Sequence, residues 1–260
     1  MKGMSIPLEA LGRYTHFVFR SFLVAPFALR RPREFLAQLY DILIGALPLG
    51  IVAGLAAGAV VWMHLRGTVE EIAGPAAVEI LPRALALAVV LEFAPIIAGL
   101  IVAGRSGASL GAELGSMRLT EQIDALEVLG LSPLRQLVAP RVLACTIALP
   151  LLTVFIAYLG ILSGFLAEIA GGGTMSWALY QRQVIKALSL SNVIPPVLKT
   201  IVFGFLIGAT GCYCGMTAEG GTEGVGRAAT RGVVVSIFLV LVSDVLLVRL
   251  IQLVLSSISQ

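Results

Sequence analysis

The residues of this chain that could do chemistry are charged groups inside long apolar segments. Glu92, Lys199, Asp244 and Arg249 each stand in a stretch made otherwise of apolar and small residues. An isolated ionised group in such surroundings is costly, so these side chains are expected to pair with one another or to serve transport. They could tie helices together, line a substrate pathway or relay protons. Proton relay is the weakest of these hypotheses, because the two histidines of the chain lie outside the apolar segments.

Common catalytic and metal-binding motifs are absent from the sequence. It has no G-x-x-x-x-G-K-[ST] phosphate loop, no G-x-S-x-G elbow and no H-E-x-x-H pair. Ser106 in GRSGAS has no histidine placed to activate it. Cys145, Cys212 and Cys214 fall in apolar segments, and Cys-Tyr-Cys is not a zinc spacing. The sequence therefore predicts no catalytic residue, no metal site, no disulfide and no enzymatic activity.

The composition is that of a polytopic membrane protein. Hydrophobic residues make up 58% of the 260 residues and charged residues only 13%, whereas soluble domains carry roughly 25% charged residues. A spanning helix needs about 20 mostly apolar residues. Five segments meet this requirement, at 42–63, 84–103, 142–167, 193–216 and 232–255. The predicted fold is an all-α membrane domain over 36–260, preceded by a separate region at 1–35.

The loops have an asymmetric distribution of lysine and arginine. With the N-terminus in the cytoplasm, twelve of the 18 fall inside and four outside. Positive residues favour the cytoplasmic side, so the N-terminus is predicted inside and the C-terminus outside. The inside set is Lys2, Arg13, Arg20, Arg30, Arg31, Arg33, Arg105, Arg118, Arg135, Arg141, Arg227 and Arg231.

The segment 8–35 alternates aromatic and basic residues and is too often interrupted to span a membrane. This pattern is typical of an interfacial amphipathic helix, with a break expected near Pro32; a disordered basic tail is the alternative. Small residues recur four apart at Gly50, Gly54 and Gly58, and in two later segments. Such faces let helices approach closely, within the chain or, for the Gly50 series, in a homodimer. The glycines between 220 and 226 are better explained by a loop that leads into a helix than by a phosphate-binding loop.

A polar stretch, GRSGASLGAELGSMRLTEQIDALEVL at 104–129, interrupts the apolar chain. Its first half has glycines at helical spacing and is expected to continue the second spanning helix. Its second half, over about 117–130, predicts a short amphipathic helix with an apolar stripe at Leu119, Ile123, Leu126 and Leu129. Gly130 is expected to end it. Its three acids disfavour contact with anionic lipids, so docking to a soluble partner is preferred over an interfacial position.

Depth along the helices predicts which intramembrane charges meet. Glu92 and Asp244 both lie near the middle of their spans at 1.5 Å rise per residue, and the stem of Lys199 can reach the same depth. Lys199 is therefore expected to pair with Glu92, with Asp244 as its second partner. Arg249 stands nearer the outer face and is able to snorkel there. A structural network and a polar cluster that takes part in transport remain equally open.

Two long runs of the sequence resemble the signatures of the MlaE/YrbE permease family. The first is EFAPIIAGLIVAGRSGASLGAELGSMRLTEQIDALEVLGLSPLRQLVAPRVLA, at 92–144, and the second is GMTAEGGTEGVGRAATRGVVVSIFLVLVSDVLL, at 215–247. The resemblance extends from about residue 35 to the C-terminus. It is weaker in the first spanning segment and after Gly171, the regions in which substrate classes of the family can differ.

The resemblance implies the permease subunit of an ABC transporter in the cell inner membrane, one that moves phospholipid to or from a periplasmic carrier. The implied partners are a second copy of the chain, two ATPase subunits and a periplasmic MCE-domain protein, and no nucleic acid. ATP and Mg would be held by the ATPase partner, so no cofactor is expected on this chain. The helix at about 117–130 would be the coupling helix, with Arg118, Glu121, Gln122, Asp124 and Glu127 as its contact residues.

Other functions stay open at this stage. The cargo of such a permease could be a sterol, a fatty acid or a solvent. An ion-coupled carrier is compatible with the intramembrane charges but does not explain a docking helix. A lipid-modifying enzyme would need polar groups near an interface, whereas the charges of this chain lie deep in the spans.

Overall fold

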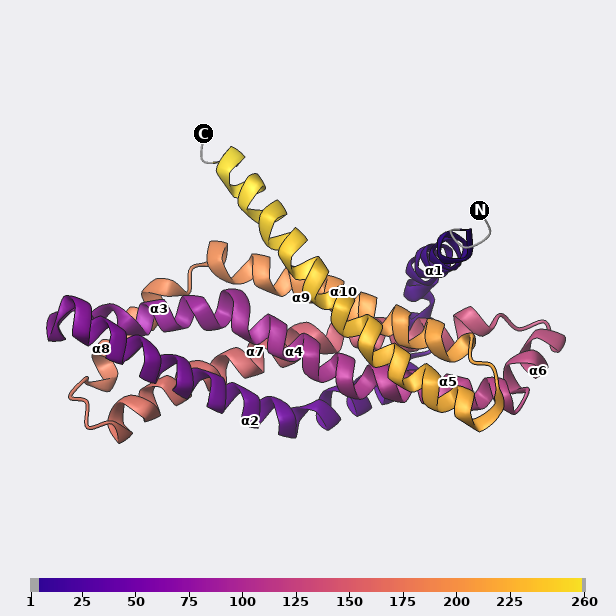
Figure 1. The fold of residues 1–260 in the computed structure, drawn as a ribbon, viewed down its shortest axis with the longest axis horizontal. Helices are drawn as coiled ribbons and strands as arrows, with labels where there is room; N and C mark the ends of the chain where they lie inside the picture. The colour runs from indigo at the N-terminus through magenta and orange to yellow at the C-terminus, as the bar shows by residue number, and fades with distance from the viewer. Residues whose placement is uncertain (1–4, 259–260) are drawn as a thin grey trace. The chain divides into compact units, whose positions relative to one another are not determined.

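The computed structural model describes residues 5–258, which form helices joined by short turns (Figure 1). No strand occurs within that range, so the all-α prediction is confirmed there. Residues 1–4 and 259–260 lie outside it, and with them Lys2 of the expected cytoplasmic set. The helices are α1 (Ser5–Val24), α2 (Pro32–Ala73), α3 (Leu81–Ala88), α4 (Ala94–Val102), α5 (Ala108–Leu119), α6 (Gln122–Val128), α7 (Ala139–Ala170), α8 (Trp177–Ala187), α9 (Leu190–Met216) and α10 (Gly221–Ile258).

Five helical spans of the described chain are long and apolar enough to cross a membrane. They are Pro32–Ile72, Ala77–Leu119, Leu134–Ala170, Asn192–Met216 and Gly221–Leu253. The five predicted segments fall in these spans, and the last of them runs on along α10. Four of the spans begin or end well outside the prediction, because the helices continue past the charged residues at which the apolar runs stop.

The second span is one continuous helical path that includes two π-helical turns. These turns, Val89–Phe93 and Ala103–Gly107, join α3 to α4 and α4 to α5. The path ends at Leu119, so the expectation that 104–115 prolongs the second helix is confirmed. A π-helical turn adds one residue to the helical register, and such turns are frequent at functional sites. One of the two carries Glu92 and the other Arg105.

The N-terminal region has the helix and the break that the sequence predicts. α1 ends at Val24 and a 3-10 turn follows over Ala25–Arg30. Arg31 leaves the helical conformation at φ −127° and ψ 65°, and α2 begins at Pro32. Proline suits a first helical position, because its missing N–H has no partner there.

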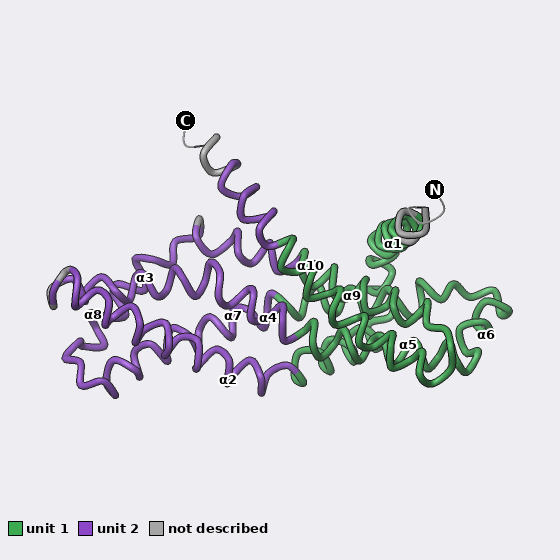
Figure 2. Tube along the Cα trace, in the orientation of Figure 1, with its two compact units in different colours: residues 1–45, 102–149, 202–243 green, residues 46–101, 150–201, 244–260 purple. Residues whose placement is uncertain are grey.

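The chain forms two compact units, each built from three separate segments (Figure 2). Unit 1 contains 1–45, 102–149 and 202–243; unit 2 contains 46–101, 150–201 and 244–260. Small residues bring the helices of unit 1 together. A methyl group added at Gly111 would lie 2.9 Å from the carbonyl oxygen of Ala228, and one at Gly208 would lie 2.9 Å from the Cα of Val142. The three cysteines are free and buried.

The Gly50, Gly54 and Gly58 series packs within unit 2. A methyl group at Gly54 would lie 3.0 Å from the carbonyl oxygen of Ile156 on α7, and one at Gly58 would overlap the carbonyl oxygen of Gly160. The intramolecular interpretation of this series is therefore confirmed, because α7 of the same chain occupies the face.

Unit 2 also contains a buried polar network that the sequence pattern does not reveal. Glu168 is buried near the end of α7, where it forms an ion pair with Arg66 and accepts a hydrogen bond from Trp62 Nε1 at 3.2 Å. The hydroxyl of Tyr180, on α8, donates to the carbonyl oxygen of Ile161 at 2.6 Å. Burial raises the pKa of Tyr180. Glu168 and Arg66 stand just beyond the ends of apolar runs, where charged residues usually face solvent, so residue type alone gives no sign of their burial.

Candidate functional site

Three separate helical elements of unit 2 bring the predicted intramembrane charges together. Glu92 comes from the π-helical turn Val89–Phe93, Lys199 from α9 and Asp244 from α10. Pro195 and Pro196 lie one turn before Lys199 within α9. A proline inside a helix removes one backbone hydrogen bond and favours a local bend. Glu92 therefore stands in an irregular turn, and Lys199 follows two prolines within a continuous α-helix.

Lys199 is the centre of an ion triad. Its Nζ donates a hydrogen bond to Glu92 Oε2 at 2.8 Å and lies 2.9 Å from Asp244 Oδ1. The second contact is an ion pair without hydrogen-bond geometry. The exposed fractions of the side chains are 2% for Lys199, 11% for Asp244 and 44% for Glu92. The pairing predicted from helix depth is therefore present in the structure.

The triad carries two carboxylates against one ammonium group. A buried lysine is tolerated only when its charge is compensated, because the cost of removing it from water is large. Lys199 has that compensation from two sides, while the Glu92 carboxylate keeps an open face. A cavity of about 190 Å³ adjoins this face. Two members of the triad line it together with apolar and amide side chains, the full lining being Leu91, Glu92, Asn192, Pro195, Pro196, Lys199, Val248, Ile251 and Gln252.

Arg249 does not join the triad. It is exposed on α10, and no ion pair among residues 5–258 includes it. Of the four intramembrane charges that the sequence predicts, three therefore form a network, and Arg249 stands apart from it. Arg249 lies five residues after Asp244 on the same helix. Five residues correspond to about 1.4 helical turns, so the two side chains point in different directions around the helix.

The predicted docking helix is shorter than the sequence indicated. Residues 117–119 belong to the end of α5, and α6 covers only Gln122–Val128. Between them Glu121 adopts the left-handed conformation with φ 57°, the only positive φ of a residue other than glycine in the described chain. This turn divides the single helix that the sequence periodicity predicts over about 117–130. The sequence hid the break because a left-handed position is usually held by glycine.

The end of α6 is the one the sequence predicts. Gly130 has φ 73°, its N–H donates to the carbonyl of Glu127 at 2.9 Å, and the N–H of Leu131 donates to the carbonyl of Leu126 at 2.9 Å. These two bonds are the Schellman arrangement that closes a helix. α6 is therefore held between a strained turn and a fixed cap.

The five predicted contact residues lie in α6, in the turn before it and at the end of α5, and they divide into two groups. Arg118 and Asp124 form an ion pair with each other, and Gln122 Nε2 donates to Thr120 Oγ1 at 2.9 Å. These three side chains hold the α5–α6 turn. Glu121 and Glu127 are exposed, and no ion pair within residues 5–258 includes either. They are the acids of this segment that remain available to a partner.

The apolar stripe of α6 is only partly buried. Ile123 is buried, but Leu119, Val128 and Leu129 are exposed, Val128 to 88%. Val128 lies outside the helical stripe, so periodicity gives no reason to select it. An exposed apolar tip flanked by acids is the composition of a protein contact. A cavity of about 430 Å³ adjoins the other side of α6, with Gln122, Leu126 and Arg141 in its lining.

Comparison with known proteins places the chain in a family. The model of the family described as Permease MlaE matches residues 35–250. The chain therefore belongs to the MlaE permease family, and it is a multi-pass membrane protein with five candidate spans. The resemblance carried by the two sequence signatures is confirmed.

Curated relatives share part of their length with the chain. A probable ABC transporter permease protein of Rickettsia typhi is 42% identical over 164 residues, which are 63% of each protein. A probable ABC transporter permease protein of Synechocystis is 37% identical over 62% of this chain and 60% of its own length. The chloroplastic protein TRIGALACTOSYLDIACYLGLYCEROL 1 of Arabidopsis thaliana is 38% identical over 63% of this chain and 46% of its own length. The matched region thus spans less than two thirds of these relatives.

Proposed function

We propose that this chain is the permease subunit of an ABC transporter and that it moves phospholipid between the inner membrane and a periplasmic MCE-domain carrier. The observation that carries the proposal is the joint presence of five apolar spans and an exposed acidic helix in a chain of the MlaE permease family. ATP is hydrolysed on a separate subunit, and the permease converts that event into movement of a lipid.

In this proposal the ATPase subunit binds at α6. Glu127 and Val128 of α6 and its flanking residues Glu121 and Leu129 are exposed, and they offer charge and apolar surface together. α6 adjoins α5, the last part of the second span, and is joined to the third span by a short connection. A displacement of α6 is therefore transmitted to two spans. A distant site can influence the spans in this way when a rigid element has two arrangements and the site shifts the equilibrium between them.

A lipid cargo is supported by the family and by one relative, and its phospholipid nature is our proposal. The printed name of the Arabidopsis protein refers to a trigalactosyl lipid of the diacylglycerol type. A cargo of this kind has two apolar tails and a polar head, and apolar spans that include a few polar groups suit it. In this proposal two copies of the chain enclose the lipid path and two ATPase subunits bind on the cytoplasmic side, where the N-terminus lies.

The ion triad has a place in the same mechanism. Lys199 contacts two carboxylates from different elements, and Glu92 retains an open face on a small cavity. An arrangement in which one cation has two partners allows the spans to shift while the charge stays compensated. We expect Lys199 to exchange between shared and single pairing as the spans move.

Reconstitution tests the proposal. The chain, its ATPase subunit and its MCE-domain partner are placed in liposomes with a fluorescent phospholipid, and transfer of the lipid to or from the carrier is followed. Transfer is expected to require ATP and to stop with an ATPase that cannot hydrolyse it. A sterol or fatty acid probe in parallel tests the cargo class. ATP-dependent transfer of those probes alone would contradict the phospholipid assignment, and no ATP dependence would contradict the transport mechanism.

A further inference from the structure

Unit 1 contains a further polar region, whose residues belong neither to the triad nor to α6. It is the cleft between α1 and the turn from α9 to α10, and it consists of two adjoining cavities of about 290 and 480 Å³. The two cavities share Thr217, Glu219 and Arg231 in their linings. We propose that this cleft, which we call the α1 cleft, binds the phosphate headgroup of an anionic phospholipid of the surrounding leaflet.

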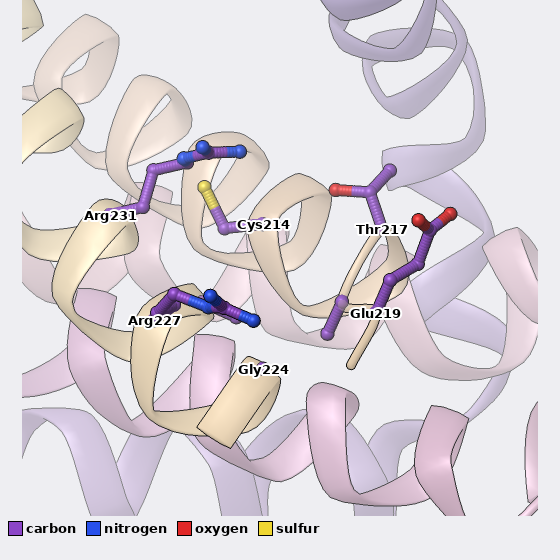
Figure 3. Close-up of a pocket in the computed structure, with 8 residues that line it drawn as sticks. Cys214, Thr217, Glu219, Gly224, Arg227 and Arg231 are labelled. Atoms are coloured by element: carbon purple, nitrogen blue, oxygen red, sulfur yellow. The ribbon is translucent and has the colours of Figure 1, made fainter. Parts of the chain in front are cut away.

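Arginine side chains dominate the charge of the α1 cleft. The larger cavity is lined by Arg13, Arg20 and Arg231 against the single carboxylate of Glu219. The smaller cavity adds Arg227. Figure 3 shows Arg227 and Arg231 extending from α10 toward the pocket on either side of Cys214. A guanidinium group offers a planar fork of donors that matches a phosphate, which makes arginine suited to such an anion.

Two of these arginines lack a carboxylate partner in the described chain. Arg13 lies 4.0 Å from Glu9, and Arg227 lies 3.4 Å from Glu223, both in exposed pairs. Arg20 and Arg231 take part in no ion pair among residues 5–258, and both are exposed. Arg20 comes from α1 and Arg231 from α10, so a single anion between them is bound from both walls of the cleft.

An aromatic floor holds the walls of the α1 cleft together. The Tyr14 hydroxyl lies 2.8 Å from Thr210 Oγ1, a hydrogen bond between α1 and α9. The rings of Tyr14 and Phe17 contact Tyr213 edge to face, with centroids 5.2 and 5.3 Å apart. Burial raises the pKa of Tyr14, in keeping with its position between α1 and α9. The cleft is therefore a built feature, with α1 fixed to α9 by polar and aromatic contacts.

The outer face of α1 indicates a lipid rather than a free phosphate ion. Phe19, Phe22 and Leu23 are exposed to 62%, 63% and 56% on the same helix that supplies Arg13 and Arg20. Aromatic and basic residues on one helix are typical of an element at headgroup depth. When a lipid is held in the cleft by its phosphate, its acyl chains can contact the exposed apolar side chains of α1. This lipid is a membrane constituent and is distinct from the transported cargo, so the inference does not depend on the proposed function.

Lipid binding to the full-length chain tests the α1 cleft. The purified chain in an uncharged detergent is titrated with dioctanoyl phosphatidylglycerol or dioctanoyl phosphatidylcholine, and bound lipid is counted by native mass spectrometry without nucleotide. The unmodified chain is expected to bind the anionic lipid at least roughly tenfold more tightly, since each basic contact favours an anionic headgroup. The double variant Arg20→Gln/Arg231→Gln is expected to lose this preference, and Arg20→Lys/Arg231→Lys to keep part of it.

A matched control removes two cations elsewhere. Arg182→Gln/Lys186→Gln changes two exposed residues of α8 and is expected to leave the preference intact. Equal loss in this control would overturn the proposal in favour of a general charge effect. Equal binding of the two lipids by the unmodified chain, or an unchanged preference in the Gln variant, would overturn it as well. Competition by inorganic phosphate at the same concentration as the lipid would show a free-anion site and overturn the lipid assignment.

Discussion

At the scale of residues, the ion triad shows how one cation can be held at the meeting point of three helical elements. Lys199 is almost completely buried, and its two partners differ in exposure, with Asp244 at 11% and Glu92 at 44%. Water in the adjoining cavity can partly compensate the Glu92 carboxylate, whereas the Asp244 carboxylate is buried and does not line that cavity. The three side chains should therefore contribute unequally to stability.

We expect Lys199→Met to be the most damaging single change in the triad. It leaves two carboxylates close together and unpaired, and removal of one partner from a buried pair costs about 3–5 kcal/mol. Asp244→Asn should cost less, and Glu92→Gln least. Thermal unfolding of the purified variants in detergent measures this order. Arg249→Gln is the control on the same helix as Asp244, and a loss as large as that of Lys199→Met would contradict the three-member triad.

The pairing within the triad can be predicted from the sequence, but not all of its surroundings can. Helix depth follows from a constant rise per residue, so residue numbers place Glu92 and Asp244 at one level, and the long side chain of Lys199 can reach that level. Direction around a helix depends on local register, which a π-helical turn shifts by one residue. Nothing in the letters VVLEF marks such a turn at Val89–Phe93. The open face of Glu92 therefore emerges only from the three-dimensional arrangement of the helices, whereas the separation of Arg249 follows from its position along α10.

At the scale of elements, close backbone approach fixes α2 against α7 in unit 2. We expect Gly58→Ala to be destabilising by about 1–3 kcal/mol, because the added methyl group overlaps the carbonyl oxygen of Gly160 and α7 must move away. Gly67→Ala on the same helix has open space around the new methyl group and should stabilise by up to about 1 kcal/mol. Unfolding midpoints measured side by side check both signs, and equal effects would contradict the packing.

The left-handed turn before α6 makes a second prediction about an element. Glu121 holds a conformation that costs a residue with a side chain about 1–2 kcal/mol relative to its ordinary regions. Glu121→Gly should therefore leave stability equal or higher while it weakens association with the ATPase subunit. Unfolding and binding measured on the same preparation separate the two effects. Unchanged binding would mean that the acid at this strained position has no role in docking.

The elements also show where periodicity misleads. Residue types predict that 104–115 continues the helix of the second span and that Gly130 ends the following helix, and the structure has both features. The division between α5 and α6 is not readable in the same way, because glutamate rather than glycine occupies the left-handed position. The predicted apolar stripe from Leu119 to Leu129 is therefore not one face of a single helix. Of its residues, only Ile123 is buried.

At the scale of the whole molecule, the distribution of basic residues predicts the topology. The native cysteines are buried, so a single exposed cysteine can report on one side of the membrane. In intact cells an impermeant maleimide should label Lys186→Cys, which is exposed on α8, and should not label Arg33→Cys, which is exposed at the start of α2. A permeant maleimide should label both variants. The reverse pattern with the impermeant reagent would contradict the predicted orientation.

The central claim is that this permease depends on an ATPase subunit that docks on α6. The most direct measurement is co-purification of the tagged full-length chain from cells that also express the ATPase, with Glu121→Lys/Glu127→Lys beside the unmodified chain and Arg182→Glu as the charge-change control on α8. The account predicts that the ATPase subunit co-purifies with the unmodified chain and the control, and that the double variant retains roughly tenfold less. Purification of the unmodified chain without the ATPase, or equal recovery with the double variant, would contradict it.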